Sequence, residues 1–103
     1  MTQQQVKEAF AQTWVHNQRM YEELPEKQKH AAQEVYYFVR WSQIQAKVAA
    51  KTGNRPSRSA VHAHLVRLCD AGFCNRVWRG HDGSFYCPAG HFAKMAERYG
   101  KAA

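Results

Sequence analysis

The residues whose types and spacing could do chemistry stand in the second half of the sequence, in the pattern C-x4-C-x12-C-x3-H: Cys69, Cys74, Cys87 and His91. Thiolate and imidazole groups are the ligands that zinc prefers, and the pattern is superficially similar to that of a zinc finger. Cys69, however, falls in the last turn of a predicted helix, and Cys74 follows Phe73 where small apolar residues commonly pack. Because a free cysteine often behaves as a small buried hydrophobe, we expect core packing and assign no metal or cofactor, with zinc binding as the alternative.

The histidines raise the question of catalysis: His16, His30, His62, His64, His81 and His91. No Ser-His-Asp or Cys-His-Asn order is supported, which leaves a Cys–His nucleophilic pair as the catalytic alternative. Several aromatic residues could stack on the bases of a single strand, namely Trp14, Tyr36, Tyr37, Phe38 and Trp41. Their helical spacing is more typical of a hydrophobic core. We therefore expect a protein that is not an enzyme.

The charge of the chain points to a polyanionic partner. Fifteen Lys and Arg face eight Asp and Glu, which gives a formal net charge of +7 and a pI near 9.6. Eight of these basic residues lie between Arg40 and Arg79, where only Asp70 opposes them. Nucleic acid is the first candidate and an anionic membrane surface the second. No apolar run reaches the roughly 18–20 residues that cross a bilayer, and the N-terminus does not resemble a signal peptide, so we expect a cytoplasmic protein without disulfides.

Helical periodicity predicts the elements that would position these residues. Residues 3–23 form the first predicted helix, with Val6, Phe10, Trp14 and Tyr21 on one side. Pro25 ends this helix and suits the start of a second one over 26–40, whose apolar stripe is Ala31, Val35, Phe38 and Val39. Ser42 is the predicted N-cap of a third helix over 43–52, which Gly53 ends.

The second half of the sequence predicts a fourth helix, a hairpin and a last helix. Ser57 is the predicted N-cap of the fourth helix, which runs to about residue 71 and has Val61, Leu65 and Leu68 on its inner face. Gly72 ends it. The stretches 73–78 and 84–87 flank an Asp-Gly pair at 82–83, which is a strong hairpin signal. Residues 89–99 form the last predicted helix, with Phe92, Met95, Ala96 and Tyr99 on one side.

Residues 46–73, AKVAAKTGNRPSRSAVHAHLVRLCDAGF, bear a resemblance to a known family. A helix of small residues is followed by Gly53, then by a helix that opens with Ser57-Arg58-Ser59 and contains Leu65 and Leu68, and then by Ala-Gly-Phe. In these features the chain resembles the winged helix-turn-helix regulators, of which MarR, ArsR and LexA-type DNA-binding domains are examples. The resemblance covers about residues 30–88. It implies one domain over 1–103, mainly α with a small β-hairpin: a winged-helix core at 26–88 with extra helices at 3–23 and 89–99.

The resemblance also implies sequence-specific binding of double-stranded DNA, with the helix that begins after Ser57 in the major groove. Arg58, Ser59, His62 and Ala63 would lie on its outward face, although a solvated helix face is the plainer interpretation. Phosphate contacts are expected from Lys47, Lys51 and Arg55, and wing contacts from Arg76, Arg79 and His81. The predicted role is that of a transcriptional regulator or a phage or plasmid control protein. The alternative is a winged-helix protein-interaction module, an inhibitor or assembly factor that docks on an acidic partner.

We further expect a homodimer joined through the terminal helices. Two-fold dimers read two half-sites about one helical turn apart, and so gain affinity over a single winged helix. The predicted helices 3–23 and 89–99 carry more apolar surface than the small core between them requires, and such a surface marks an interface when exposed. In the alternative, both helices fold back onto the core of their own chain.

Overall fold

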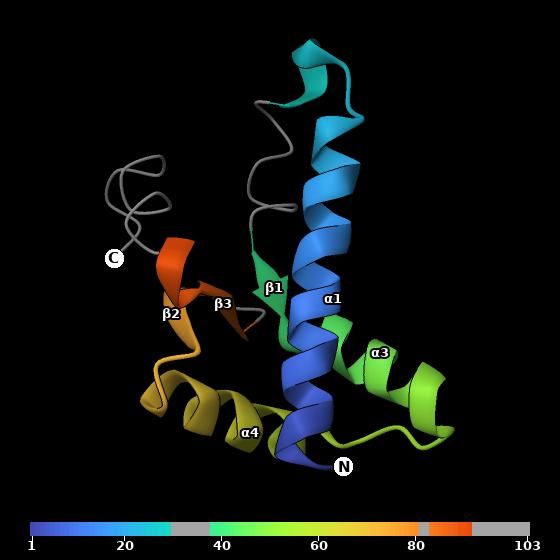
Figure 1. Ribbon diagram of the computed structural model, residues 1–103, viewed down its shortest axis with the longest axis vertical. Coiled ribbons are helices and arrows are strands. Elements are labelled where there is room, and N and C mark those ends of the chain that lie inside the picture. Colours follow the sequence, from blue (N-terminus) through green and yellow to red (C-terminus); the bar gives the residue numbers. More distant parts are fainter. Residues whose placement is uncertain (30–37, 81–82, 92–103) are drawn as a thin grey trace.

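The structure is a computed structural model that describes residues 1–29, 38–80 and 83–91 (Figure 1). Within these residues the chain is mainly helical and has a small antiparallel sheet of three strands. The mainly helical class is therefore confirmed, and the sheet has one strand more than the expected hairpin. None of the helices in the described ranges is long and apolar enough to cross a membrane.

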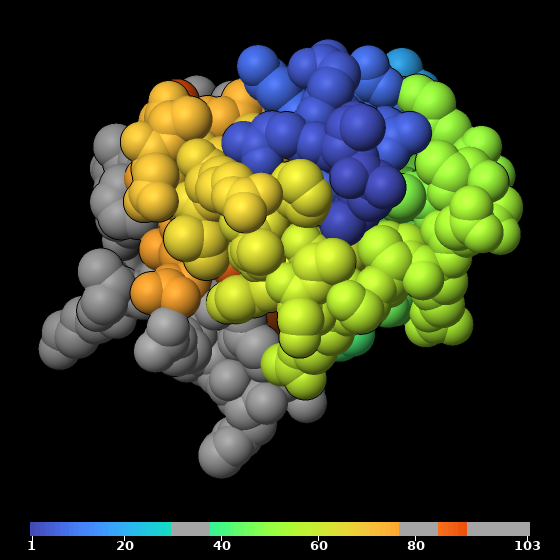
Figure 2. Space-filling view, turned by 90° about the horizontal axis from the view of Figure 1, so that it is seen from below, coloured from blue at the N-terminus to red at the C-terminus, as the bar shows by residue number. Residues whose placement is uncertain are grey.

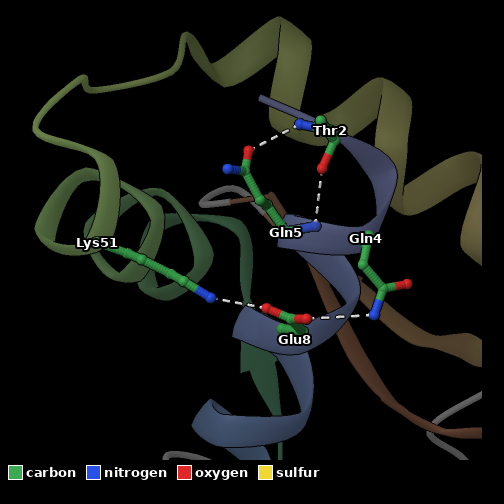
Figure 3. Close-up of polar contacts among 5 residues, drawn as sticks. All are labelled: Thr2, Gln4, Gln5, Glu8 and Lys51. Atoms are coloured by element: carbon green, nitrogen blue, oxygen red, sulfur yellow. Dashed lines mark hydrogen bonds and ion pairs between the residues drawn. The ribbon is translucent and has the colours of Figure 1, made fainter.

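Helix α1 spans Gln3–Glu22, close to the predicted 3–23. Thr2 caps it: its hydroxyl oxygen accepts from the Gln5 backbone N–H at 3.1 Å, and the Gln5 side chain accepts from the Thr2 backbone N–H at 2.9 Å (Figure 3). This reciprocal arrangement satisfies two backbone donors at once. The apolar residues of the predicted stripe are all buried in the core of the same chain: Val6, Phe10, Trp14 and Tyr21.

The predicted helix over 26–40 is wrong at its C-terminal end. Residues 26–29 are helical, residues 30–37 lie outside the described ranges, and Val39–Arg40 forms strand β1. β1 pairs with β3, with Val39 opposite Tyr86 and Arg40 opposite Phe85. The Phe38 ring stacks on Phe85 with centroids 5.5 Å apart, and the buried Asn17 side chain donates to the Phe38 carbonyl at 3.1 Å. These long-range contacts favour the extended backbone over the helix that local periodicity suggests.

Helix α3 spans Trp41–Thr52 and begins two residues before the prediction. Arg40 is its N-cap, and the Gln43 side chain accepts from the Arg40 backbone N–H at 3.0 Å. Ser42 is therefore not the cap, because strand β1 leads directly into the helix. The end of α3 is as predicted: Gly53 has φ +78° and donates its N–H to the Ala49 carbonyl at 2.9 Å. Glycine adopts this left-handed conformation without steric cost.

Helix α4 spans Arg58–Asp70, with Ser57 as its N-cap, and confirms the predicted fourth helix. Strands β2 (Cys74–Gly80) and β3 (Gly83–Pro88) form the predicted hairpin, and the sheet order is β1-β3-β2. The 3₁₀ turn η1, Ala89–His91, stands where the last predicted helix should begin, so an α-helix from residue 89 is wrong. The apolar side predicted for that helix, from Phe92 to Tyr99, lies outside the described residues.

The core lies where α1, α3, α4 and the sheet meet (Figure 1). α1 runs along this junction, and α3 and α4 pack near its N-terminal half. The inner residues of α3 and α4 are fully or almost fully buried: Ile44, Val48, Val61, Leu65 and Leu68. The packing leaves the opposite side of α4 at the surface.

Candidate nucleic-acid interface

The N-terminus of α4 is the starting point of the candidate interface. The Ser57 hydroxyl oxygen accepts from the Ala60 backbone N–H at 3.1 Å, which confirms the predicted cap. A helix N-terminus carries partial positive charge and backbone N–H donors that favour an anion such as phosphate. Arg58 is the first residue of α4, so a full positive charge stands beside the positive end of the helix dipole.

The surface side of α4 carries the predicted base-reading residues. Arg58, Ser59 and Ala63 are exposed, and His62 is partly buried. Val66 is 42% exposed, which extends this side with an apolar residue that sequence reasoning did not select. Figure 2 views this part of the molecule, with α4 in yellow tones between α3 in light green and the start of β2 in orange. Atoms of α4 form part of the molecular surface in this view.

Trp41 positions Arg58. The Arg58 guanidinium lies 4.9 Å from the centre of the Trp41 ring, and Trp41 packs in turn against the core. A guanidinium stacks on an aromatic ring through its face, whereas its N–H groups point outward in its own plane. The stacked guanidinium can therefore still donate hydrogen bonds to a partner. The starts of α3 and α4 are thus joined by one side-chain contact. Sequence reasoning placed Trp41 in the core and did not predict this contact.

Gln45 braces the connection between α3 and α4, and sequence reasoning missed it. Its side-chain N–H donates to the Pro56 carbonyl at 2.8 Å, and its side-chain oxygen accepts from the Arg55 guanidinium at 3.0 Å. Gln45 is buried beside Ile44, so the available signal was a polar residue on the buried side of a predicted helix. Arg55 is exposed but tied to this amide, which places its charge next to the start of α4.

The two lysines of α3 lie on a different side of the molecule. Lys51 pairs with Glu8 of α1, with 2.8 Å between the ammonium nitrogen and the carboxylate oxygen (Figure 3). Hydrogen bonds from Lys51 and Gln4 hold the pKa of Glu8 below its usual value. Lys47 lines a groove between α1 and α3. The start of α4 therefore brings together Arg55, Ser57, Arg58 and Ser59. Both lysines, in contrast, lie on the side of α3 that faces α1.

The structure describes the three predicted wing residues, Arg76, Arg79 and His81, to different extents. Arg76 is exposed on β2 and lies opposite Tyr86 of β3. Arg79 pairs with Ser84 near the end of the hairpin, but its side chain is not among those described. His81 lies outside the described residues altogether. The β2–β3 ladder has a register irregularity between Arg76 and Trp78.

The cysteines confirm the predicted core packing. Cys74 and Cys87 are fully buried, and Cys69 packs against the same cluster while partly exposed. Burial raises the pKa of Cys87 to about 12. Across the described residues no three His, Cys, Asp or Glu side chains come together as metal ligands. The side chain of His91, the fourth residue of the Cys-His pattern, is not among the side chains that the structure describes.

Two further predictions concern aromatic and histidine side chains. Trp14 and Phe38 are buried in the core, as predicted, and Tyr36 and Tyr37 lie outside the described residues. His64 faces α1 rather than the surface side of α4, because its Nδ1 lies 2.9 Å from the side-chain oxygen of Gln3. Desolvation, together with the positive charges of Arg67 and the N-terminus, lowers the pKa of His64. His64 is thus a structural residue between two helices.

Comparisons of the chain with protein-family models, curated proteins and solved structures find no significant match.

Proposed function

We propose that this chain is a winged helix-turn-helix protein that binds double-stranded DNA in a sequence-specific manner and has no enzymatic activity of its own. In this proposal α4 is the recognition helix and the β2–β3 hairpin is the wing. The observation that carries the proposal is the exposed, basic first turn of α4, where Arg58 lies on the Trp41 ring beside the capped helix start.

The order of the elements supports the proposal. α3 and α4 follow each other with only residues 53–57 between them, and the hairpin comes directly after α4. β1 joins the outer side of β3, so the sheet anchors the hairpin to the residues that precede α3. A helix pair followed by an anchored hairpin is the arrangement in which one helix enters the major groove and the hairpin approaches the flanking backbone.

Physical chemistry assigns a role to each group. An arginine at a recognition-helix surface can donate two hydrogen bonds to guanine, which is worth about 1–3 kcal/mol of discrimination. Arg55 and the amides of the first turn of α4 would bind phosphate, and the net charge of +7 adds long-range attraction. Phosphate contacts set the position and the salt dependence of binding, and Arg58 would set the sequence preference.

The test begins with selection of binding sequences from random duplexes, followed by titration of a fluorescent selected duplex at moderate salt. Arg58→Ala should weaken binding to the selected duplex by about 5- to 150-fold, the equivalent of about 1–3 kcal/mol. Its binding to random duplex should change much less. Circular dichroism should show an intact fold, because Arg58 is exposed.

Arg19→Ala is the matched control, because Arg19 is an exposed arginine on α1 and the substitution removes the same charge. If Arg58→Ala and Arg19→Ala bind the selected duplex equally well, α4 is not the recognition helix. A selection that enriches no sequence would contradict sequence-specific binding as a whole. In a cell, the proposed activity is cytoplasmic control of transcription or of a phage or plasmid.

A homodimer remains part of the proposal, but α1 does not support it. The apolar residues of α1 that suggested an interface are buried in the core of the same chain. The other predicted contributor, the helix over 89–99, falls mostly outside the described ranges. Sedimentation at micromolar concentration decides the point: a mass near the 11.9 kDa monomer, unchanged on addition of DNA, would contradict the dimer.

One observation favours the alternative of a protein-interaction module. An open groove of about 420 Å³ runs between α1 and α3, lined by Ala11, Gln12, Val15, His16, Arg19 and Lys47. None of these lining side chains is a carboxylate, and Val15 is 47% exposed, so an acidic segment with apolar residues fits the groove. Retention on heparin without binding to random duplex would favour this alternative. Loss of DNA binding with Arg58→Ala but not with Lys47→Ala would favour the recognition helix.

A further inference from the structure

Two thiols face each other where α4 ends and β2 begins. Cys69 lies in the last turn of α4 and Cys74 is the first residue of β2, and their sulfur atoms are 3.4 Å apart. At this distance the two free thiols are in contact. Neither thiol takes part in the proposed binding of DNA. The pair is therefore a candidate site in its own right.

The turn between the two cysteines holds them in place. Gly72 has φ +82° and donates its N–H to the Cys69 carbonyl at 3.0 Å, and the Phe73 N–H donates to the Leu68 carbonyl at 2.9 Å. These paired bonds form the glycine-dependent closure that commonly ends a helix. The Phe73 ring packs edge-on against Phe10 of α1, with centroids 5.5 Å apart. The two sulfurs are thus brought together by a braced turn.

The two thiols differ in access and in charge. Cys69 is partly exposed, whereas Cys74 is fully buried. The hydrogen bond between the two sulfurs lowers the pKa of Cys69. Burial and the charge of Asp70 oppose this shift, whereas the charge of Arg76 and a hydrogen bond from its backbone add to it. The same hydrogen bond and burial raise the pKa of Cys74. A partly exposed thiol with a lowered pKa, in contact with a buried second thiol, is the arrangement of a reactive and a resolving cysteine.

We propose that Cys69 and Cys74 form a reversible intramolecular disulfide on reaction with a hydroperoxide. The Cys69 thiolate attacks the distal peroxide oxygen, the O–O bond breaks, and the leaving alkoxide or hydroxide takes a proton from water. The resulting Cys69 sulfenic acid is attacked by the sulfur of Cys74, which gives up its proton. An S–S bond forms and water leaves. Overall the dithiol loses two electrons and two protons, and the peroxide is reduced to an alcohol and water, or to two waters. A thiol reductant reverses the reaction.

Formation of the disulfide requires little movement. A disulfide has about 2.05 Å between its sulfurs, so the present 3.4 Å must close by rotation of the two side chains and a small shift of the turn. The third cysteine, Cys87, is fully buried and belongs to β3. It therefore serves as an internal control for the pairing.

The experiment treats the reduced full-length protein with hydrogen peroxide in the presence of a metal chelator, and follows the intact mass and the peptide map. The expected result is the loss of two hydrogen atoms per chain, a cross-link between the peptides of Cys69 and Cys74, and recovery of the original mass with dithiothreitol. Cys87→Ala should behave like the unchanged protein. Cys69→Ala should lose the reaction.

Other outcomes would overturn the proposal. These are a cross-link to Cys87, a disulfide between two chains, direct passage of Cys69 to the sulfinic acid, or the same mass loss in Cys69→Ala. Cys74→Ala should stop at a sulfenic acid that a 1,3-diketone traps at Cys69. Because Cys74 is fully buried and its substitution can impair folding, the peptide map of the unchanged protein decides the pairing independently.

Discussion

The guanidinium of Arg58, the first residue of α4, lies 4.9 Å from the centre of the ring of Trp41, the first residue of α3. The contact joins the starts of the two helices and restricts the orientations of an exposed arginine. An arginine restricted before it binds loses less side-chain entropy when it meets its target. In the proposed function, Trp41 is thus a positioning residue for the group that reads the base pair.

Replacement of Trp41 by Leu should weaken binding to the selected duplex by about two- to fivefold. An exposed cation–π contact is worth about 0.5–1 kcal/mol, and Leu retains part of the packing against the core. The double variant Trp41→Leu, Arg58→Ala should bind no more weakly than Arg58→Ala alone, because the two residues act together. Fluorescence titration of all four proteins measures this cycle. Independent, additive losses would contradict the positioning role.

The salt dependence of DNA binding should separate two basic residues that the sequence places at the DNA, Lys51 as a phosphate contact and Arg76 as a wing contact. Lys51 is paired with Glu8 on the α1 side, whereas Arg76 is exposed on the hairpin. Arg76→Gln should reduce the slope of log affinity against log salt by about one unit, the effect of one lost phosphate contact. Lys51→Gln should leave the slope unchanged. Titrations across a range of salt concentrations measure both slopes, and equal reductions would place Lys51 at the interface.

Ser57 and Ser42 form a matched pair for helix capping. Ser57→Ala should lower the free energy of unfolding by about 0.5–2 kcal/mol, because the Ala60 backbone N–H loses its side-chain acceptor. Ser42→Ala should have almost no destabilising effect, because Ser42 lies inside α3 and is exposed. Urea unfolding of the two variants gives the comparison. A larger loss with Ser42→Ala would restore Ser42 as the cap of α3.

The pKa of His64 in the folded chain should be lower than its pKa in the unfolded chain. Desolvation is the main cause, and Arg67 and the N-terminal ammonium add repulsion. Because the unfolded state then binds more protons, the contribution of His64 to stability is present above the unfolded pKa. It is lost as the pH falls through the folded pKa. NMR titration of the folded chain and of the chain in urea measures both values. A folded value equal to or above the unfolded one would contradict the prediction.

Oxidation of the Cys69–Cys74 pair should lower the affinity for the selected duplex. This expectation rests on the proposed function, because even a small shift of the turn between α4 and β2 would move the proposed recognition helix relative to the wing. Fluorescence titration before and after peroxide measures the effect, and Cys69→Ala should be insensitive. A disulfide that forms without any change in affinity would separate the dithiol from DNA binding and leave both as independent properties.

The sequence by itself determined the elements whose signals are local. The limits of α4 follow from Ser57 and Gly72, and the end of α3 follows from Gly53. The inner residues of α4 follow from helical spacing, and the hairpin follows from the Asp-Gly pair between two β-rich stretches. Capping, left-handed glycines and periodicity act within a few residues, so they can be recognised without knowledge of the fold.

Only the tertiary structure decided the features that depend on distant partners. Val39 and Arg40 lie in a helical pattern, but their backbone pairs with β3 more than forty residues later, and no local signal reports such a partner. Arg58 meets Trp41 and Lys51 meets Glu8 in the same way, whereas Cys69 and Cys74 are five residues apart and meet across the turn that ends α4. The predicted site residues were chosen for charge and helical position. Which of them share one surface depends on how α1 packs against α3 and α4, because that packing buries one side of each helix and leaves the other side open.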